Sequence, residues 1–317
     1  MVRRGSLFSL QGRDQKSIKG GSMLKGSIVA LVTPFETGGQ INDNEFKKLI
    51  DWQIEKGTDG ILVCGTTGES ATLTHPEHRK IIELAVTYVN KRVPVLAGCG
   101  SNSTQEALNL TSHAKKVGAD YSLVITPYYN KPTQEGLYKH FRGIADSVDI
   151  SIIIYNVPSR TGSNILPETV ARLYKDCKNI VGIKEASGSL DQITKIMTLV
   201  DDKFLLFSGS DEVNLPILSI GGSGAVSVVA NIMPKETHDL VAAFLDGNLA
   251  EAKRLQLYLY DIIKALFIET NPTPVKTSLG LMKMIEPNMR LPLCEMSAAN
   301  LDKLKTILKK YKLIKEI

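Results

Sequence analysis

The residue with the clearest chemical potential is Lys184, which lies inside the apolar run IVGIKEAS at 180–187. Side chains alternate along a strand, so Lys184 and its neighbour Glu185 point to opposite faces and do not form a side-by-side pair. Burial disfavours the charged amine, lowers its pKa and makes the neutral amine a nucleophile toward ketones. Two interpretations stay open: a nucleophile that forms a Schiff base, or a strand-end lysine that extends into solvent.

Polar residues that could bind or activate a substrate follow other apolar runs. The loop GTTGES at 65–70 combines glycines, which let backbone amides approach a ligand, with the hydroxyls of Thr66 and Thr67. This composition suits a carboxylate, although an ordinary strand-to-helix loop can have it too. The motif YNVPSRTG begins with Tyr155, which could shuttle protons or stand half-buried with its hydroxyl in water. In the same motif, Arg160 offers a fork for a second carboxylate or for a surface salt bridge.

The sequence shows little sign of a catalytic metal site or of a nucleophilic serine. His75 and His78 share one helix face but lack a third ligand nearby, and neither an HxH at a strand end nor an HExxH occurs. A nucleophile elbow of the GxSxG type is also missing. We therefore predict no catalytic metal.

The elements that must position these residues alternate between short Val- and Ile-rich runs and longer amphipathic stretches. The strand-like runs are 27–35, 59–65, 94–100, 121–129, 151–158, 180–187, 204–210 and 224–231. The helical patterns between and after them include 43–56, 104–117, 167–174, 249–268 and 297–311. Eight such units predict an α/β fold, a (β/α)8 TIM barrel over 23–246, with a helical C-terminal region over 247–317 packed on the barrel. A doubly wound sheet is the alternative, but no GxGxxG follows the first strand.

Composition narrows the function classes. The chain of 317 residues is 43% hydrophobic and 22% charged, which is typical of a globular protein. Residues 1–22 hold five basic residues and one acidic residue, so the rest carries only +1 of the net charge of +5. Because this net charge is so small, we expect no nucleic acid as a partner. We also expect no membrane as a partner, because the uncharged stretch 214–234 is broken by proline and glycine. The leader 1–22 is predicted to be a tag, a transit peptide or disordered chain, and four unpaired cysteines indicate a cytoplasmic protein.

Several motifs together resemble one enzyme family. They are GTTGES at 65–70, TPYYNKPTQEGLY at 126–138, YNVPSRTG at 155–162, GIKEASG at 182–188 and NPTPVK at 271–276. In this order and spacing they resemble the 4-hydroxy-tetrahydrodipicolinate synthases, long called dihydrodipicolinate synthases, from about Met23 to the C-terminus. The resemblance implies a class I aldolase-like barrel that works without a cofactor, as a homotetramer built as a dimer of dimers.

The resemblance also implies roles for individual residues. Lys184 would form the Schiff base with pyruvate, and Tyr155, Thr67 (or Thr66) and Tyr129 would form a proton relay. Tyr129 would be lent by the neighbouring subunit. Thr66 and Thr67 would hold the pyruvate carboxylate. The remaining substrate contacts would be Arg160, for the carboxylate of aspartate semialdehyde, and the pocket positions Gly209 and Val226.

The implied reaction condenses pyruvate with L-aspartate 4-semialdehyde to 4-hydroxy-tetrahydrodipicolinate, in lysine (diaminopimelate) biosynthesis. Alternatives are an N-acetylneuraminate lyase, a 2-keto-3-deoxy sugar acid aldolase on the same scaffold, or a non-catalytic barrel that binds small acids. L-Lysine, the end product, is expected to inhibit the enzyme. The positions that match the family's lysine site are Ser70, Ala71, His75, His78, Asn102, Glu106 and Tyr128.

Overall fold

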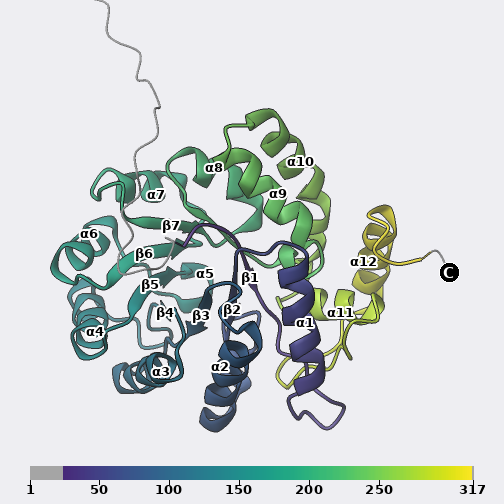
Figure 1. Ribbon diagram of the computed structural model, residues 1–317, viewed down its shortest axis with the longest axis horizontal. Coiled ribbons are helices and arrows are strands. Elements are labelled where there is room, and N and C mark those ends of the chain that lie inside the picture. The colour runs from purple at the N-terminus through teal and green to yellow at the C-terminus, as the bar shows by residue number, and fades with distance from the viewer. Residues whose placement is uncertain (1–23, 316–317) are drawn as a thin grey trace, which may run out of the picture.

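A computed structural model describes residues 24–315, which form a barrel surrounded by helices (Figure 1). The leader predicted at 1–22 lies outside the described residues. The strands are β1 Gly26–Ala30, β2 Gly60–Val63, β3 Val95–Gly98, β4 Tyr121–Ile125, β5 Ser151–Asn156, β6 Ile180–Glu185, β7 Leu205–Ser208 and β8 Gly224–Ser227. All neighbours are parallel, and β1 also pairs with β8, so the sheet closes into a barrel. The predicted (β/α)8 architecture is confirmed.

The strands end earlier than the sequence predicts. The run predicted over 59–65 stops at Val63, because Cys64 has φ of 54° and turns the chain away from the sheet. The run predicted over 121–129 likewise stops at Ile125. The residues left over form the loops at the carboxyl ends of the strands, where catalytic residues of such barrels are found.

A ring of helices covers the outside of the barrel. They are α1 Asp43–Glu55, α2 His75–Val89, α3 Thr104–Val117, α4 Gln134–Ser147, α6 Pro167–Asp176, α7 Leu190–Met197, α8 Asn214–Ser219 and α9 Pro234–Leu245. The short helix α5 Pro158–Thr161 follows β5 directly and lies at the barrel mouth, inside this ring (Figure 1). Several begin at side-chain caps that satisfy free backbone amides. The Asn42 side chain accepts from the Glu45 amide, and Thr74 and Glu77 form a reciprocal capping box at the start of α2.

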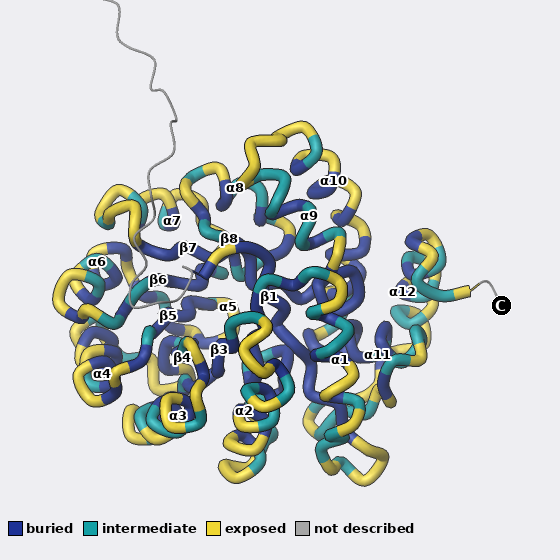
Figure 2. The backbone as a smooth tube through the Cα atoms, viewed as in Figure 1, coloured by how far each residue is buried: buried dark blue, intermediate teal, exposed yellow. Residues whose placement is uncertain are grey.

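Apolar side chains fill both faces of the barrel wall. Leu62, Leu96, Leu123 and Phe207 belong to the interior layer, whereas larger apolar clusters lie between strands and helices. In Figure 2 the strands are dark blue at the centre, and the exposed yellow segments lie on the outer helix faces and loops. Strands that are buried on both faces explain the continuous Val and Ile runs of the sequence.

The C-terminal region consists of α10 Leu249–Ala265, α11 Thr273–Leu281 and α12 Ala298–Lys310. Helix α10 packs against α9, α12 packs against α10 and α11, and α11 contacts the 3-10 helix η3 Val229–Asn231. Two more 3-10 helices, η1 Ser70–Thr72 and η2 Asp211–Val213, follow β2 and β7. The segment that leads into α11 reaches the barrel loops, where Asn271 contacts Thr67.

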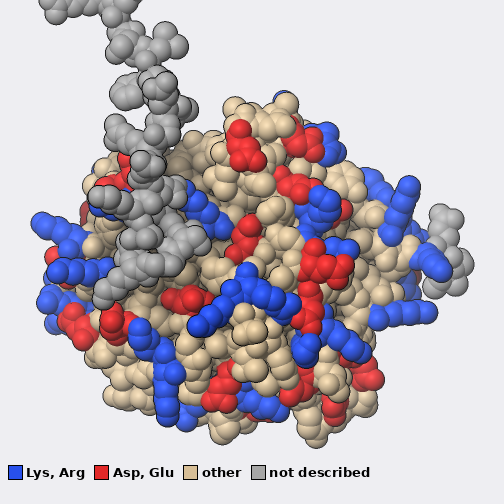
Figure 3. Space-filling model, in the orientation of Figure 1, with Lys and Arg blue, Asp and Glu red and all other residues tan. Residues whose placement is uncertain are grey.

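The uncharged stretch 214–234 divides as expected, into α8, β8, η3 and the start of α9. Among residues 24–315, no helix has the length and apolar character needed to cross a bilayer. On the molecular face in Figure 3, basic and acidic side chains are interspersed.

Candidate active site

Lys184 points into the barrel near the carboxyl end of β6. It pairs in register with Tyr155 of β5, and its Nζ lies 4.2 Å from the centre of the Tyr155 ring. Glu185 points to the other face, where it accepts hydrogen bonds from Asn156 and Gln192. The predicted alternation is therefore observed, and only 6% of Lys184 is exposed.

Burial changes the acid–base character of both residues. Desolvation lowers the pKa of Lys184 to about 7, with a smaller lowering from Arg160 and an opposing effect from the buried Asp211 carboxylate. Desolvation also raises the pKa of Tyr155, while the positive charge of Arg160 and a hydrogen bond with Thr66 oppose this rise. At neutral pH the site thus holds a substantial fraction of neutral amine beside a protonated phenol.

Two small or apolar residues shape the space around the amine. Gly209 follows β7, and a Cβ built there would lie 3.1 Å from Cε of Lys184 and 2.8 Å from Cβ of Ala186. Val226 lies on β8, in the same interior layer as Tyr155. Gly209, predicted as a pocket position, is therefore next to Lys184. A larger residue at position 209 would crowd the lysine side chain.

A buried ion pair stabilises the loop at residues 65–70. Thr67 is buried and Thr66 is partly exposed. Glu69, whose φ of 53° is unusual for a residue with a side chain, forms a 2.5 Å ion pair with Lys276 of α11. Both side chains are fully buried, and Lys276 also donates to the Thr33 carbonyl at 2.9 Å. This pairing fixes the turn that presents the two threonines.

Arg160 stands on α5 at the barrel mouth. Its guanidinium donates to the backbone carbonyl of Asn271 at 3.3 Å. The side-chain amide of Asn271, in turn, donates to Oγ1 of Thr67 at 3.0 Å. One residue of the C-terminal region therefore contacts both predicted carboxylate-binding groups.

Within residues 24–315, Tyr129 makes no hydrogen bond with the other predicted relay residues, which are Tyr155, Thr66 and Thr67. It lies 89% exposed in the loop after β4, with φ of 70°. Its ring extends from the surface of the single chain.

The residues predicted to bind lysine lie in three neighbouring loops beside the mouth. His75, at the start of α2, lies 3.3 Å from Glu106 of α3, and Glu106 also accepts from Ser101 at 2.5 Å. His78 is buried and its Nε2 lies 2.7 Å from the Gly98 carbonyl, and burial lowers its pKa. The other members are Ser70 and Ala71 in η1, Asn102 before α3, and Tyr128 after β4. Asn130 links two of these loops by donating to the Asn102 carbonyl at 2.9 Å.

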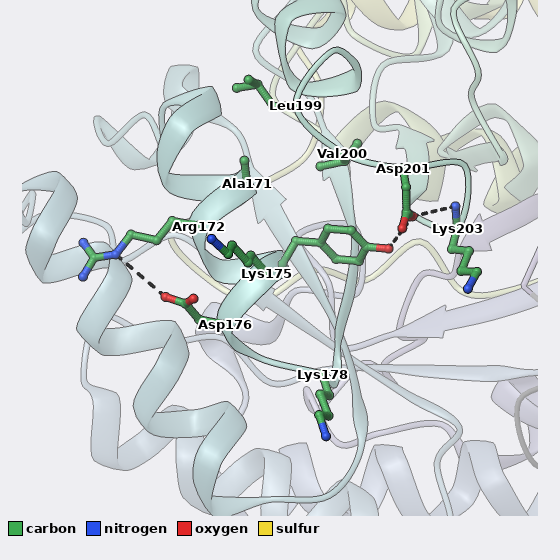
Figure 4. Close-up of a pocket in the computed structure, with 10 residues that line it drawn as sticks. Ala171, Arg172, Lys175, Asp176, Lys178, Leu199, Val200, Asp201 and Lys203 are labelled. Carbon is green, nitrogen blue, oxygen red and sulfur yellow. Dashed lines mark hydrogen bonds and ion pairs between the residues drawn. The ribbon is translucent and has the colours of Figure 1, made fainter.

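A metal-binding cluster, or a cavity outside the barrel mouth, would be a further candidate for a functional site. In the part of the chain that the structure describes, no three His, Cys, Asp or Glu side chains are placed to hold a metal ion. A cavity of about 930 Å³ opens on the outside of the barrel, between α6 and the α7–β7 connection (Figure 4). Its lining includes Arg172, Lys175, Asp201 and Lys203, and none of the predicted site residues.

Sequence reasoning missed the supports of the site. It gave Asn271 and Lys276 no role beyond the family motif, and it overlooked Asp211. A signal existed for Lys276, a charged residue within the apolar segment TPVKTSLGL that forms α11. No local signal marks Asn271, because its partner Thr67 is 204 residues away.

Comparison with known proteins gives a consistent result. Residues 23–311 match the Dihydrodipicolinate synthetase family. A 4-hydroxy-tetrahydrodipicolinate synthase of Geobacter sp. (strain M21) is 55% identical over 92% of this chain and all of its own length. The crystal structure of dihydrodipicolinate synthase from Aquifex aeolicus has a TM-score of 0.90 at 49% identity, covering 92% of this chain and 100% of that one. The synthase from Cyanidioschyzon merolae with lysine bound has a TM-score of 0.89 at 39% identity, covering 93% of this chain and 100% of that one.

Proposed function

The chain belongs to the dihydrodipicolinate synthetase family, and we propose that Lys184 is the residue on which its reaction takes place. The reaction condenses pyruvate with L-aspartate 4-semialdehyde in lysine biosynthesis. The observation that carries the proposal is the position of Lys184, a buried lysine beside Tyr155 at the carboxyl end of β6. Burial there lowers its pKa to about 7, so that its amine is partly neutral at physiological pH.

The first half of the reaction follows from amine chemistry. The neutral Nζ of Lys184 attacks the ketone carbon of pyruvate, and the carbinolamine loses water to form an iminium ion. The positive nitrogen acidifies the methyl group, which releases a proton and becomes an enamine carbon. Tyr155, protonated and in contact with the lysine, supplies and removes the protons of these steps.

The second half uses the aldehyde substrate. The enamine carbon attacks the aldehyde of the semialdehyde, which forms the new carbon–carbon bond. The amine of the same substrate then attacks the imine carbon, releases Lys184 and closes the ring. Thr66 and Thr67 hold the pyruvate carboxylate, and Arg160 receives that of the semialdehyde.

A second copy of the chain completes the relay in this proposal. Tyr129 extends from the surface with nine-tenths of its area exposed, so it is free to enter a neighbouring site. The proposed assembly is a homotetramer built as a dimer of dimers. The four cysteines, none in a disulfide, support a reducing, cytoplasmic setting.

Inhibition by L-lysine is the regulatory part of the proposal. Glu106 would accept from the α-ammonium group, Tyr128 and Asn102 would donate to the carboxylate, and Ser70, Ala71 and His75 would surround the ε-ammonium group. The short distance between His75 and Glu106 supports this grouping, as does the lysine bound to the Cyanidioschyzon merolae relative. Initial rates that do not change in millimolar lysine would exclude it.

Replacement of the lysine tests the catalytic assignment. Lys184→Ala is expected to abolish condensation while the circular dichroism spectrum stays that of a folded barrel. The control is Lys175→Ala, on the outer face of α6, which should retain the rate of the parent protein. Turnover by Lys184→Ala near that of the control would show that another group carries the reaction.

A further inference from the structure

The buried amide of Asn271 is unusual because the fold makes little use of it. The residue is 4% exposed, and its Oδ1 has no hydrogen-bond partner within residues 24–315. Burying an amide with an unpaired oxygen is costly, and a folded chain rarely keeps such a group without a reason. Its one side-chain hydrogen bond goes to Thr67, at the loop that faces the reaction site.

The direction of this hydrogen bond matters for chemistry. Nδ2 of Asn271 is the donor, so Oγ1 of Thr67 is the acceptor. A hydroxyl that accepts from one side keeps its own hydrogen for another acceptor, and no protein acceptor for Thr67 is present among the described residues. Asn271 thereby leaves the Thr67 hydroxyl free to donate to a carboxylate.

We infer that Asn271 is a positioning residue for pyruvate, which acts through the hydroxyl of Thr67. This inference rests on the proposed function, in which Thr67 holds the pyruvate carboxylate. The backbone carbonyl of Asn271 also accepts from Arg160. That second contact belongs to the main chain, so a change of side chain leaves its acceptor in place. The side chain of Asn271 therefore governs pyruvate and not the semialdehyde.

Steady-state kinetics separate the two substrates. For a covalent mechanism, kcat/KM for pyruvate reports imine formation and kcat/KM for the semialdehyde reports the later condensation. Asn271→Ala is expected to lower kcat/KM for pyruvate about tenfold, the usual scale for one lost hydrogen bond. The same variant should keep kcat/KM for the semialdehyde within about threefold of the parent value.

Asn271→Asp, which keeps the shape of the side chain and adds a charge, separates the effect of the hydrogen bond from the effect of side-chain volume. In Asn271→Asp a carboxylate replaces the donor, takes the Thr67 hydrogen for itself and repels the substrate carboxylate. We expect a larger loss for pyruvate with Asp than with Ala, although Asp has the shape of Asn. The control is Asn248→Asp, which adds the same charge at the exposed cap of α10 and keeps an acceptor for the Glu251 amide. The control should match the parent protein.

A double-mutant cycle decides whether Asn271 acts through Thr67. The four proteins are the parent, Thr67→Val, Asn271→Ala and the double variant, each compared by kcat/KM for pyruvate. We expect Asn271→Ala to cost about tenfold in the parent and less than about twofold in the Thr67→Val background. An equal loss in both backgrounds, or no loss in the parent, would overturn the inference. Thermal unfolding of each variant identifies any that fail to fold, and the cycle needs only the Ala and Val substitutions.

Different measurements test the catalytic role of Lys184 and the positioning role of Asn271. If borohydride with pyruvate does not modify Lys184 in the parent protein, the catalytic assignment is wrong. If Lys184 is modified in the parent but Asn271→Ala and the parent have equal kcat/KM for pyruvate, only the role of Asn271 is wrong.

Discussion

The buried ion pair between Lys276 and Glu69 yields the sharpest stability prediction. Lys276→Met removes the charge and keeps most of the apolar volume, so it leaves the Glu69 carboxylate buried without its partner. Both side chains are fully buried and their charged atoms are 2.5 Å apart. Breaking such a pair from one side costs about 3–5 kcal/mol. That is a large share of the roughly 5–15 kcal/mol that stabilises a typical domain.

Urea unfolding of the parent and the variants measures this cost. Removing both charges, in Glu69→Gln with Lys276→Met, should recover most of the loss, because no unpaired charge then stays buried. The matched control is Lys235→Met, which breaks an exposed pair with Asp239 on α9 and should leave the urea midpoint close to that of the parent protein. If Lys276→Met unfolds like the control, or if the double variant is less stable than the single one, the reasoning about this pair is wrong.

Further predictions concern catalysis and regulation. Because burial lowers the pKa of Lys184 to about 7, kcat/KM for pyruvate should rise with pH up to about 7 and then level; a rise that continues to pH 10 would mean a solvated lysine. Tyr155→Phe should reduce kcat by roughly 100-fold or more in the steady-state assay, the scale of one lost general acid–base group, and an unchanged kcat would remove Tyr155 from the relay. Arg160→Ala should lower kcat/KM for the semialdehyde by roughly 10- to 100-fold, the scale of a lost charge-assisted hydrogen bond, and affect pyruvate less; equal losses for both substrates would argue against its proposed role. Glu106→Gln should raise the lysine concentration that gives half-inhibition while the enzyme still turns over, and an unchanged inhibition curve would exclude Glu106 from the lysine site.

The barrel could be predicted because its strands are buried on both faces. Such strands are continuous apolar runs in the sequence, and a lysine within one of them, Lys184, stands out at once. Where each strand ends was less predictable. The apolar run continues through Cys64, but the backbone turns there into a conformation that residue types alone do not reveal.

The groups around the lysine were only partly predictable. Alternation predicted that Lys184 and Glu185 point to opposite faces, but it did not say which of them faces the barrel interior. It also does not apply in the loop that holds Thr66 and Thr67. The sequence therefore left open which of the two threonines acts in the relay. The contact of Asn271 with Thr67 joins residues 204 positions apart, and no periodicity or motif spacing encodes it.

The most direct test of the central claim is a mass measurement on the Lys184 peptide. The protein is incubated with pyruvate, treated with borohydride and digested, and the peptides are compared with a sample treated without pyruvate. We predict a reduced pyruvate adduct on Lys184, formed without added metal or cofactor. An unmodified Lys184 peptide, or an adduct on a different lysine in a protein that still condenses its substrates, would contradict the account.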